Sequence, residues 1–216
     1  MPPLPREPGR DCALCSRLVT YRQANRDAWP DWHNAPVPAF GPLDARLLVV
    51  GLAPGLKGAN RTARPFTGDW AGDLLYATLD KFGFSEGTYA ADPGDGLALT
   101  GAMITNAVRC VPPENKPVGA EIKACRPFLA SRIASLPQLK VMLCLGKISH
   151  DSTVRALGLK LKDYPFGHGT KYGVKADGRD LTLLSSYHCS RYNTNTGRLT
   201  AEMFEDVFAM AREAIG

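Results

Sequence analysis

Small, aromatic and acidic residues that together could hold a planar ligand follow an apolar run near position 50. The run Leu47–Val50 is typical of a buried strand, and it leads into a loop rich in glycine and proline. Glycine lets the backbone approach a ligand closely, so backbone N–H groups, an aromatic ring and a carboxylate would surround one pocket. In open α/β sheets, ligands bind at the carboxyl ends of strands. The loop is therefore a candidate site, with Gly51, Leu52, Ala53, Gly55, Phe66 and Asp69 as its candidate residues.

Further polar side chains stand where two later apolar runs end. Asn106 lies at the end of the second run, and its amide carries a donor and an acceptor that could match the edge of a pyrimidine-like base. The alternative for Asn106 is a turn residue that satisfies the backbone. His188 and Ser190 follow the fourth run and could donate hydrogen bonds to an oxyanion or a phosphate. A lone histidine is commonly structural, but a position beside two other polar strand ends favours a functional His188.

Four of the six cysteines have a spacing that indicates a metal centre. Cys12 and Cys15 form a Cys-x-x-Cys pair, and Cys110 and Cys125 lie 15 positions apart. Four thiolates complete the ligand set of a [4Fe–4S] cluster or of a tetrahedral zinc ion. A zinc ribbon more often has two Cys-x-x-Cys pairs, so the single pair favours the cluster, in a structural role that pins the N-terminus. Four unrelated thiols are the remaining alternative, and Cys144, within an apolar run, is interpreted as a core residue.

A modest positive charge permits, but does not require, a polyanionic partner. The net charge is +5, with 26 Lys and Arg against 21 Asp and Glu. An ordinary slightly basic surface would have the same composition. The basic residues nevertheless gather in three loops, and these would form a polyanion-binding rim if the loops converged: Lys57, Arg61 and Arg64 in the first, Arg109 and Lys116 in the second, Arg191 and Arg198 in the third.

Alternating apolar runs and helical patterns define the elements that must position these residues. Strands are predicted at roughly 46–51, 102–107, 139–145 and 181–186. Helices are predicted at about 70–83, 119–135, 147–157 and 200–214. This alternation predicts an α/β fold, a three-layer α/β/α arrangement around a central, mostly parallel four-stranded sheet. The segment 86–100 is predicted to be a loop.

The length of 216 residues and a hydrophobic content of 44% favour a single packed domain over 1–216. Residues 1–40 carry little periodicity and are predicted to form an irregular N-terminal wrap held by the Cys-x-x-Cys pair. No run is long enough for a membrane span and no secretory signal is visible, so we expect a cytoplasmic protein.

Taken together, these motifs resemble the uracil-DNA glycosylase superfamily, and most closely its family 5, the iron–sulfur type b enzymes of bacteria and archaea. The match is carried by Gly51–Gly55, Asn60–Thr62, Arg64–Asp69, Ile104–Asn106, the cysteine set, and the stretch from His188 to Thr200. The resemblance implies hydrolysis of the N-glycosidic bond of uracil in DNA after the nucleotide flips out of the helix. It also implies deaminated purines such as hypoxanthine and xanthine as substrates, and a protein that acts as a monomer.

The resemblance implies a role for each site residue. Phe66 would stack on the flipped base, Asn106 would read its edge, and His188 would stabilise charge on O2 of the base as the bond breaks. The backbone from Gly51 to Gly55 would contact base or sugar. Arg61, Ser190 and Arg191 would bind the DNA backbone, and Tyr192 would be the wedge that fills the space left by the base, the alternative being an exposed loop aromatic.

Two positions depart from the superfamily pattern. Leu52 stands where many relatives have a water-positioning carboxylate or amide, so Asp69 is the best replacement, with an N-cap as its alternative role. Cys189 stands where proline is usual, which could loosen the His188 loop and place an oxidisable thiol near DNA.

Two rival functions follow from the same residues. A phosphate-ester hydrolase or nucleotide-binding protein is disfavoured because the glycine loop lacks the P-loop ending. A non-catalytic, zinc-stabilised nucleic-acid-binding domain would account for the cysteines, the basic loops and Leu52 together.

Overall fold

A five-stranded sheet forms the centre of the computed structural model, which describes residues 4–216. The strand order is β4-β1-β5-β7-β6, and the first four of these strands are parallel. These four are the predicted ones: β1 (Leu47–Gly51), β4 (Ala102–Asn106), β5 (Val141–Leu145) and β7 (Arg179–Ser186). The α/β class and the parallel arrangement are confirmed.

The prediction of four strands is wrong, because the central sheet has a fifth strand at its edge. Strand β6 (Lys171–Ala176) pairs antiparallel with β7, through a tight turn at Asp177 and Gly178. Both turn residues have positive φ (51° and 72°), which is the backbone of a type I′ hairpin. An edge strand is only partly buried, so it lacks the continuous apolar run that marked the other four. The Asp-Gly pair was the available signal.

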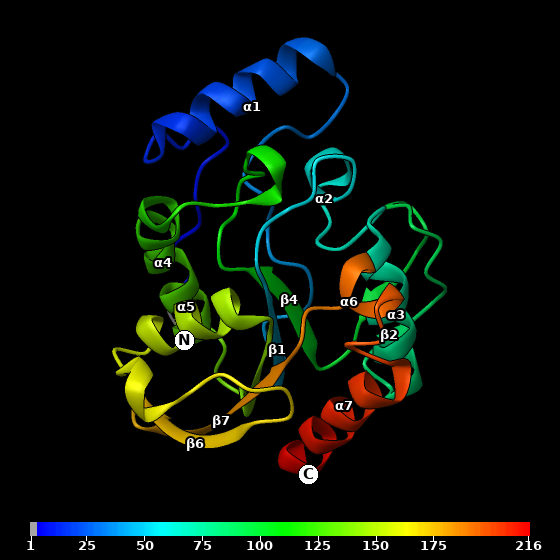
Figure 1. The fold of residues 1–216 in the computed structure, drawn as a ribbon, viewed down its shortest axis with the longest axis vertical. Coiled ribbons are helices and arrows are strands. Elements are labelled where there is room, and N and C mark those ends of the chain that lie inside the picture. The colour runs from blue at the N-terminus through cyan, green and yellow to red at the C-terminus, as the bar shows by residue number, and fades with distance from the viewer. Residues whose placement is uncertain (1–3) are drawn as a thin grey trace.

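Helices cover both faces of the sheet, as predicted (Figure 1). On one face lie α3 (Trp70–Lys81) and α7 (Ala201–Ile215), and on the other lie α4 (Gly119–Ala134) and α5 (Lys147–Ala156). Alternate residues of each strand face opposite layers, so Val49 packs with α3 and α7 while Val50 packs on the α4 side. The stripe of α7 predicted to be core, including Phe204 and Phe208, is buried.

The parallel register brings the ends of the strands to one edge of the sheet. Gly51 at the end of β1 pairs with Asn106 at the end of β4. Leu145 of β5 pairs with Ser186 of β7 in the same way. The loops that carry the predicted site residues therefore start side by side.

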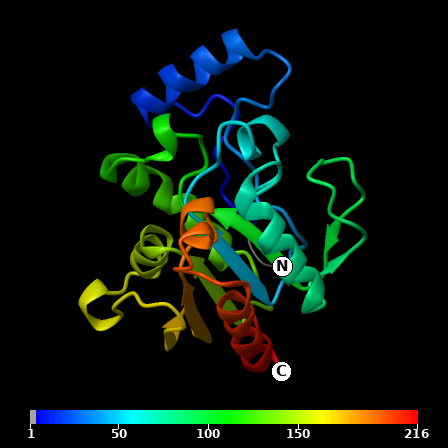
Figure 2. The same ribbon diagram turned by 45° about the vertical axis from the view of Figure 1, so that its right-hand side comes forward.

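The N-terminal region is not irregular throughout, because α1 (Ser16–Ala28) begins directly after Cys15. Its apolar periodicity is weak, which is why the sequence did not show it. Leu18 packs with Val108 and Phe128, in a small cluster that also includes the four cysteines Cys12, Cys15, Cys110 and Cys125. In both views α1 lies beyond the carboxyl ends of the strands (Figures 1 and 2).

The segment predicted as a loop over 86–100 has paired ends, β2 (Ser85–Glu86) and β3 (Ala98–Leu99), and extends beside α3 (Figure 2). Asp95 within it forms an ion pair at 2.7 Å with Arg64. Both side chains are buried, so Arg64 does not belong to a basic rim.

Short elements complete the chain: α2 (Ala59–Thr62), α6 (Arg191–Asn195) and the 3₁₀ helices η1 (Pro113–Asn115) and η2 (Leu161–Asp163). Among residues 4–216, no helix is both long enough and apolar enough to cross a membrane.

Candidate active site and cysteine pocket

A cavity of about 440 Å³ opens at the carboxyl ends of β1 and β4, within the roughly 300–1,000 Å³ of small-molecule sites. Most of the predicted site residues line it: Leu52, Ala53, Gly55, Phe66, Asp69, Asn106, His188, Ser190 and Arg191. Trp70, Ala71 and Asn115 also line it and were not singled out from the sequence. The hydrogen-bonding and aromatic groups proposed for one ligand therefore face a common space.

Gly51 does not line the cavity itself but lies against two residues that do, Asn106 and Phe66. A β-carbon at this position would overlap the amide oxygen of Asn106 and the ring of Phe66. Phe66 itself has a positive φ of 57°, unusual for a bulky residue, and its ring stacks with His188 at a centroid distance of 6.0 Å. Strain of this kind concentrates at functional sites. The absence of a side chain at Gly51 lets the ring and the amide meet.

Asp69 stands directly before α3, where an aspartate commonly caps a helix, yet its side chain makes no capping hydrogen bond. Its carboxyl group lies instead against Gly55 and Gly58, where a β-carbon would overlap it. Burial raises the pKa of Asp69, and the backbone N–H groups of Ala59 and Gly55 and the charge of Arg61 offset part of this rise. The N-cap alternative is therefore wrong, and the carboxyl group faces the cavity.

Two polar atoms at this cavity are buried without a partner among residues 4–216: Oδ1 of Asn106 and Nδ1 of His188. Buried polar atoms are nearly always paired, so two orphans in one cavity indicate a ligand that supplies the missing partners. Burial also lowers the pKa of His188 to about 4. The imidazole is therefore neutral near pH 7, and a neutral imidazole has one nitrogen that can donate a hydrogen bond and one that can accept.

The loop that carries His188 is fixed by contacts that replace the missing proline. Asn193 donates from Nδ2 to the backbone oxygen of His188 at 2.8 Å. Cys189 is fully buried, with its Sγ 3.5 Å from the backbone oxygen of Ala71. The expectation of an oxidisable thiol near DNA is therefore wrong, because this thiol is inaccessible and burial raises its pKa to about 12.

Two of the predicted DNA-binding residues, Ser190 and Arg191, line the cavity, and Tyr192 follows them on α6. Arg191 lies over the ring of Trp70 at 5.2 Å, and Tyr192 on α6 is 71% exposed. Ser190 accepts a hydrogen bond from the backbone of Asn193 and so caps α6. Arg61 is exposed near Asp69.

Arg109 was predicted to join the basic rim, and the structure contradicts this. Its side chain is 1% exposed and donates to the Glu7 carboxylate at 2.5 Å. Further hydrogen bonds join Arg109 to the backbone of Val37 and to Thr105. Of the basic residues in the three loops, Lys57, Arg61, Lys116, Arg191 and Arg198 are exposed and remain candidates for such a rim.

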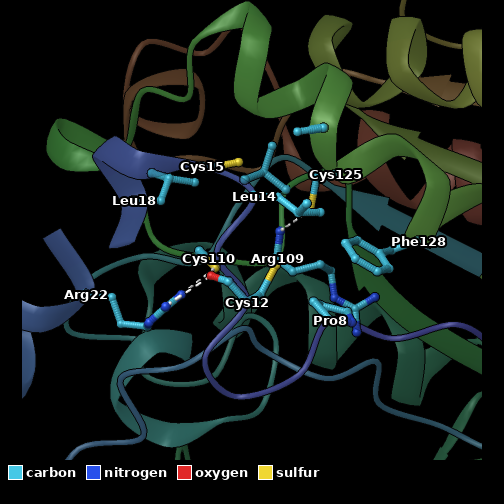
Figure 3. A pocket seen from close by; sticks show the side chains of 12 residues that line it. Pro8, Cys12, Leu14, Cys15, Leu18, Arg22, Arg109, Cys110, Cys125 and Phe128 are labelled. Carbon is cyan, nitrogen blue, oxygen red and sulfur yellow. Dashed lines mark hydrogen bonds between the residues drawn. The ribbon is translucent and has the colours of Figure 1, made fainter. Parts of the chain in front are cut away.

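The four predicted metal ligands line a separate small pocket between α1, α4 and the loop after β4 (Figure 3). Cys12 and Cys15 come from the N-terminal segment, Cys110 from the loop and Cys125 from α4. Cys144 is buried elsewhere, in the core, as predicted. Within residues 4–216, no three His, Cys, Asp or Glu side chains are arranged around the position of a single metal ion.

Two arginines donate N–H hydrogen bonds to two of the sulfur atoms in this pocket. Arg22 donates to Sγ of Cys110 at 3.9 Å and to the backbone oxygen of Cys12 at 3.0 Å. The backbone N–H of Arg109 donates to Sγ of Cys125 at 3.3 Å. Burial raises the pKa of Cys110 to about 11 and of Cys125 to about 12, so bare thiols would remain protonated here. Donors aimed at sulfur suit thiolates that bind a cation.

The fold and the cavity at its strand ends describe an α/β protein with a candidate ligand-binding site, and comparison with known proteins identifies the class. The family model described as the uracil DNA glycosylase superfamily matches residues 38–212. This range includes every residue that lines the cavity, and Cys12 and Cys15 precede it.

Individual relatives indicate which family of this superfamily the chain resembles. A type-5 uracil-DNA glycosylase of Thermus thermophilus is 44% identical over 95% of this chain and 94% of its own length. Type-5 proteins of Mycobacterium bovis and Pyrobaculum aerophilum are 39% and 34% identical, each over 95% of this chain and over 78% and 90% of their own lengths. A type-4 protein of P. aerophilum is 30% identical over 70% of this chain. The chain belongs to the uracil-DNA glycosylase superfamily and, within it, to the type-5 family.

Proposed function

We propose that this protein is a monofunctional DNA glycosylase of base-excision repair, which hydrolyses the N-glycosidic bond of uracil in DNA. Hypoxanthine and xanthine are proposed as further substrates. The observation that carries the proposal is the shared cavity that is lined by a ring, an amide, a neutral imidazole and a partly buried carboxylate. The names of the type-5 relatives support the same activity. We expect it to act as a monomer in the cytoplasm.

The base is proposed to enter the cavity by flipping out of the DNA. Phe66 provides the stacking surface, and the orphaned oxygen of Asn106 accepts a hydrogen bond from the base. Tyr192, exposed on α6 beside Arg191, would fill the gap in the stack, while Arg61, Ser190 and Arg191 would hold the backbone. Damaged DNA, single- or double-stranded, is the partner.

The chemical step breaks the bond between C1′ of the sugar and the base nitrogen. The bonding electrons move to the base, and the negative charge that appears on its O2 is stabilised by an N–H of His188. Asp69 stabilises the cationic sugar and orients water, which adds to C1′ and passes its proton to the carboxylate. Leu52 offers no polar group to the water, so this role falls to Asp69.

We expect Asn106→Ala to weaken discrimination between bases more than it weakens DNA binding. The amide is the group aimed at the base edge, and a lost hydrogen bond of this kind costs about 1–3 kcal/mol. The measurement is single-turnover base release from otherwise identical duplexes that carry uracil, hypoxanthine, xanthine or hydroxymethyluracil. An unchanged ranking of the four bases would contradict the assignment.

We further propose that Cys12, Cys15, Cys110 and Cys125 hold a [4Fe–4S] cluster with a structural role. The thiols share one pocket and receive N–H donors, but they are not arranged around one ion. Sulfurs that ligate a cubane surround a group of iron and sulfide atoms, so they stand further apart than the ligands of one zinc ion. When bound, such a cluster supplies four metal–thiolate bonds that join the N-terminal segment to α4.

Replacing Cys125 by Ser should remove iron from the protein and release α1. The measurements are iron and zinc content per chain, visible absorption, and limited proteolysis within residues 4–28. Cys144→Ala removes a thiol outside the pocket and should leave the iron content unchanged. One zinc and no iron per chain in the wild type would refute the cluster in favour of zinc.

The rival function, a nucleic-acid-binding domain without catalysis, makes a different prediction for the same sample. It predicts binding to uracil-containing DNA with no alkali-labile site formed. Strand cleavage by alkali at the uracil position excludes it.

A further inference from the structure

A third cavity, of about 160 Å³, lies between α4 and α5, which pack side by side (Figure 1). Two arginines line it, Arg126 from α4 and Arg155 from α5. The proposed activity uses neither residue. The positive charges of the two guanidinium groups meet in one small space, which is unfavourable unless an anion compensates them.

No ion pair or side-chain hydrogen bond joins either arginine to another residue in the described part of the chain. The Nε of Arg126 is buried without a partner. Arg126 is half-buried and Arg155 is exposed. By contrast, the buried Arg64 and Arg109 are paired, with Asp95 and Glu7.

A hydroxyl group completes the cavity. Ser152 on α5 is 1% exposed, and its Oγ is buried without a hydrogen-bond partner among residues 4–216. Among residues 4–216, Asp151 is the only carboxylate that lines the cavity, and it forms an ion pair with Lys147 at 2.6 Å. The cavity therefore offers two cations and an unpaired hydroxyl, with its one anion already neutralised. This donor set suits a tetrahedral oxyanion.

The position of the cavity indicates where such an oxyanion comes from. Ile148 lines this cavity and also a neighbouring one of about 310 Å³, which reaches Lys147 and Arg198. That neighbouring cavity shares Leu52 and His188 with the candidate active site. The three cavities thus adjoin one another through shared lining residues, from the candidate active site along the first turns of α5 to the arginine pair.

We propose that Arg126, Arg155 and Ser152 bind a backbone phosphate of the DNA, beyond the nucleotide held in the active site. This inference rests on the proposed function in so far as DNA is the ligand. It extends the DNA footprint over the α4–α5 face, away from α6. A phosphate at this position would also supply the missing hydrogen-bond partners of Arg126 Nε and Ser152 Oγ.

The test is the salt dependence of binding to a fluorescein-labelled, undamaged duplex, followed by anisotropy. Each phosphate contact contributes about 0.9 to the slope of log K against log salt concentration. We expect Arg155→Ala to reduce the slope by about that amount and to weaken binding several-fold at low salt. Ser152→Ala should weaken binding without changing the slope. Lys123→Ala removes an equal charge from an exposed position on α4 outside the cavity, and should leave the slope unchanged.

Equal slopes for the wild type and Arg155→Ala would overturn the inference. It would also be overturned if Arg155→Ala lost binding of inorganic phosphate, followed by ³¹P NMR, while its DNA slope stayed normal. Because the duplex is undamaged, a wild type that releases no uracil would refute the proposed function and leave this test valid. Arg155→Ala is preferred to Arg126→Ala, because Arg126 adjoins Cys125.

Discussion

Asp69→Asn is expected to slow release of uracil by a factor of about 10²–10⁴, the usual contribution of a general base. The amide keeps the size of the carboxylate and an oxygen that can accept from the backbone of Gly55 and Ala59. It loses the charge that stabilises a cationic sugar and the site that accepts a proton from water. The side chain of Asp69 makes no capping hydrogen bond to α3, so the melting temperature of Asp69→Asn should differ little from that of the wild type.

The measurement for Asp69 is a single-turnover rate with enzyme in excess over a uracil duplex, beside the affinity for the same duplex. Asp73→Asn is the matched control, because it removes an exposed carboxylate four residues along the same helix. A normal rate in Asp69→Asn would exclude the catalytic role. A slow rate in both variants would point to a general effect of charge on α3.

The pH dependence of the same rate follows from the pKa shift of Asp69. Burial raises its pKa, so this carboxylate is protonated at a higher pH than an exposed aspartate. Activity requires the charged form and should therefore fall as the pH is lowered through this raised pKa. The Asp69→Asn profile should lack that acidic decline.

His188→Ala is expected to cost about 10²–10³ in the rate, the usual effect of removing one donor to a developing oxyanion. His188→Gln, which keeps an N–H donor, should recover part of the loss. Since the pKa of His188 is lowered to about 4, the wild-type rate should show no ionisation near pH 6.5. A histidine ionisation near 6.5 that vanishes in His188→Gln would show that the imidazole acts as a cation.

The same shift in the pKa of His188 has a consequence for stability. A histidine that folds with a lowered pKa takes up a proton on unfolding between pH 4 and its ordinary value of 6.5. Its contribution to the free energy of unfolding is complete above pH 6.5 and is lost as the pH falls toward 4. His188→Gln should therefore show a weaker pH dependence of stability in that window.

The sequence predicted the parts of this protein that depend on local pattern. Buried parallel strands gave continuous apolar runs such as Leu47–Val50, and the stripe of α7 gave a helical period. Strand β6 was missed because half of its surface is exposed. Helix α1 was missed because its buried face includes Arg22 and Asn25 rather than a clear apolar stripe.

The sequence identified cavity-lining residues that directly follow strands. It misassigned residues whose hydrogen-bond or ion-pair partners lie far away in the chain. Arg64 and Arg109 look like surface cations in sequence, because Asp95 and Glu7 lie 31 and 102 positions away. Trp70 appeared only as the start of a helix, and Asn115 as part of a proline-rich loop. Their place in the cavity depends on how the loops after β1 and β4 fold over the sheet, which no local pattern encodes.

The packing of α1 has a consequence for the order of events during synthesis. Leu18 buries its side chain against Val108 and Phe128, about ninety to a hundred and ten residues later in the chain. At about 5–20 residues per second, the ribosome needs roughly 5–20 s to make that stretch. Throughout this interval the first helix and its two thiols have no docking surface. The N-terminal arm is therefore expected to stay unprotected until the chain as far as Phe128 has emerged from the ribosome, although it precedes that segment in the chain.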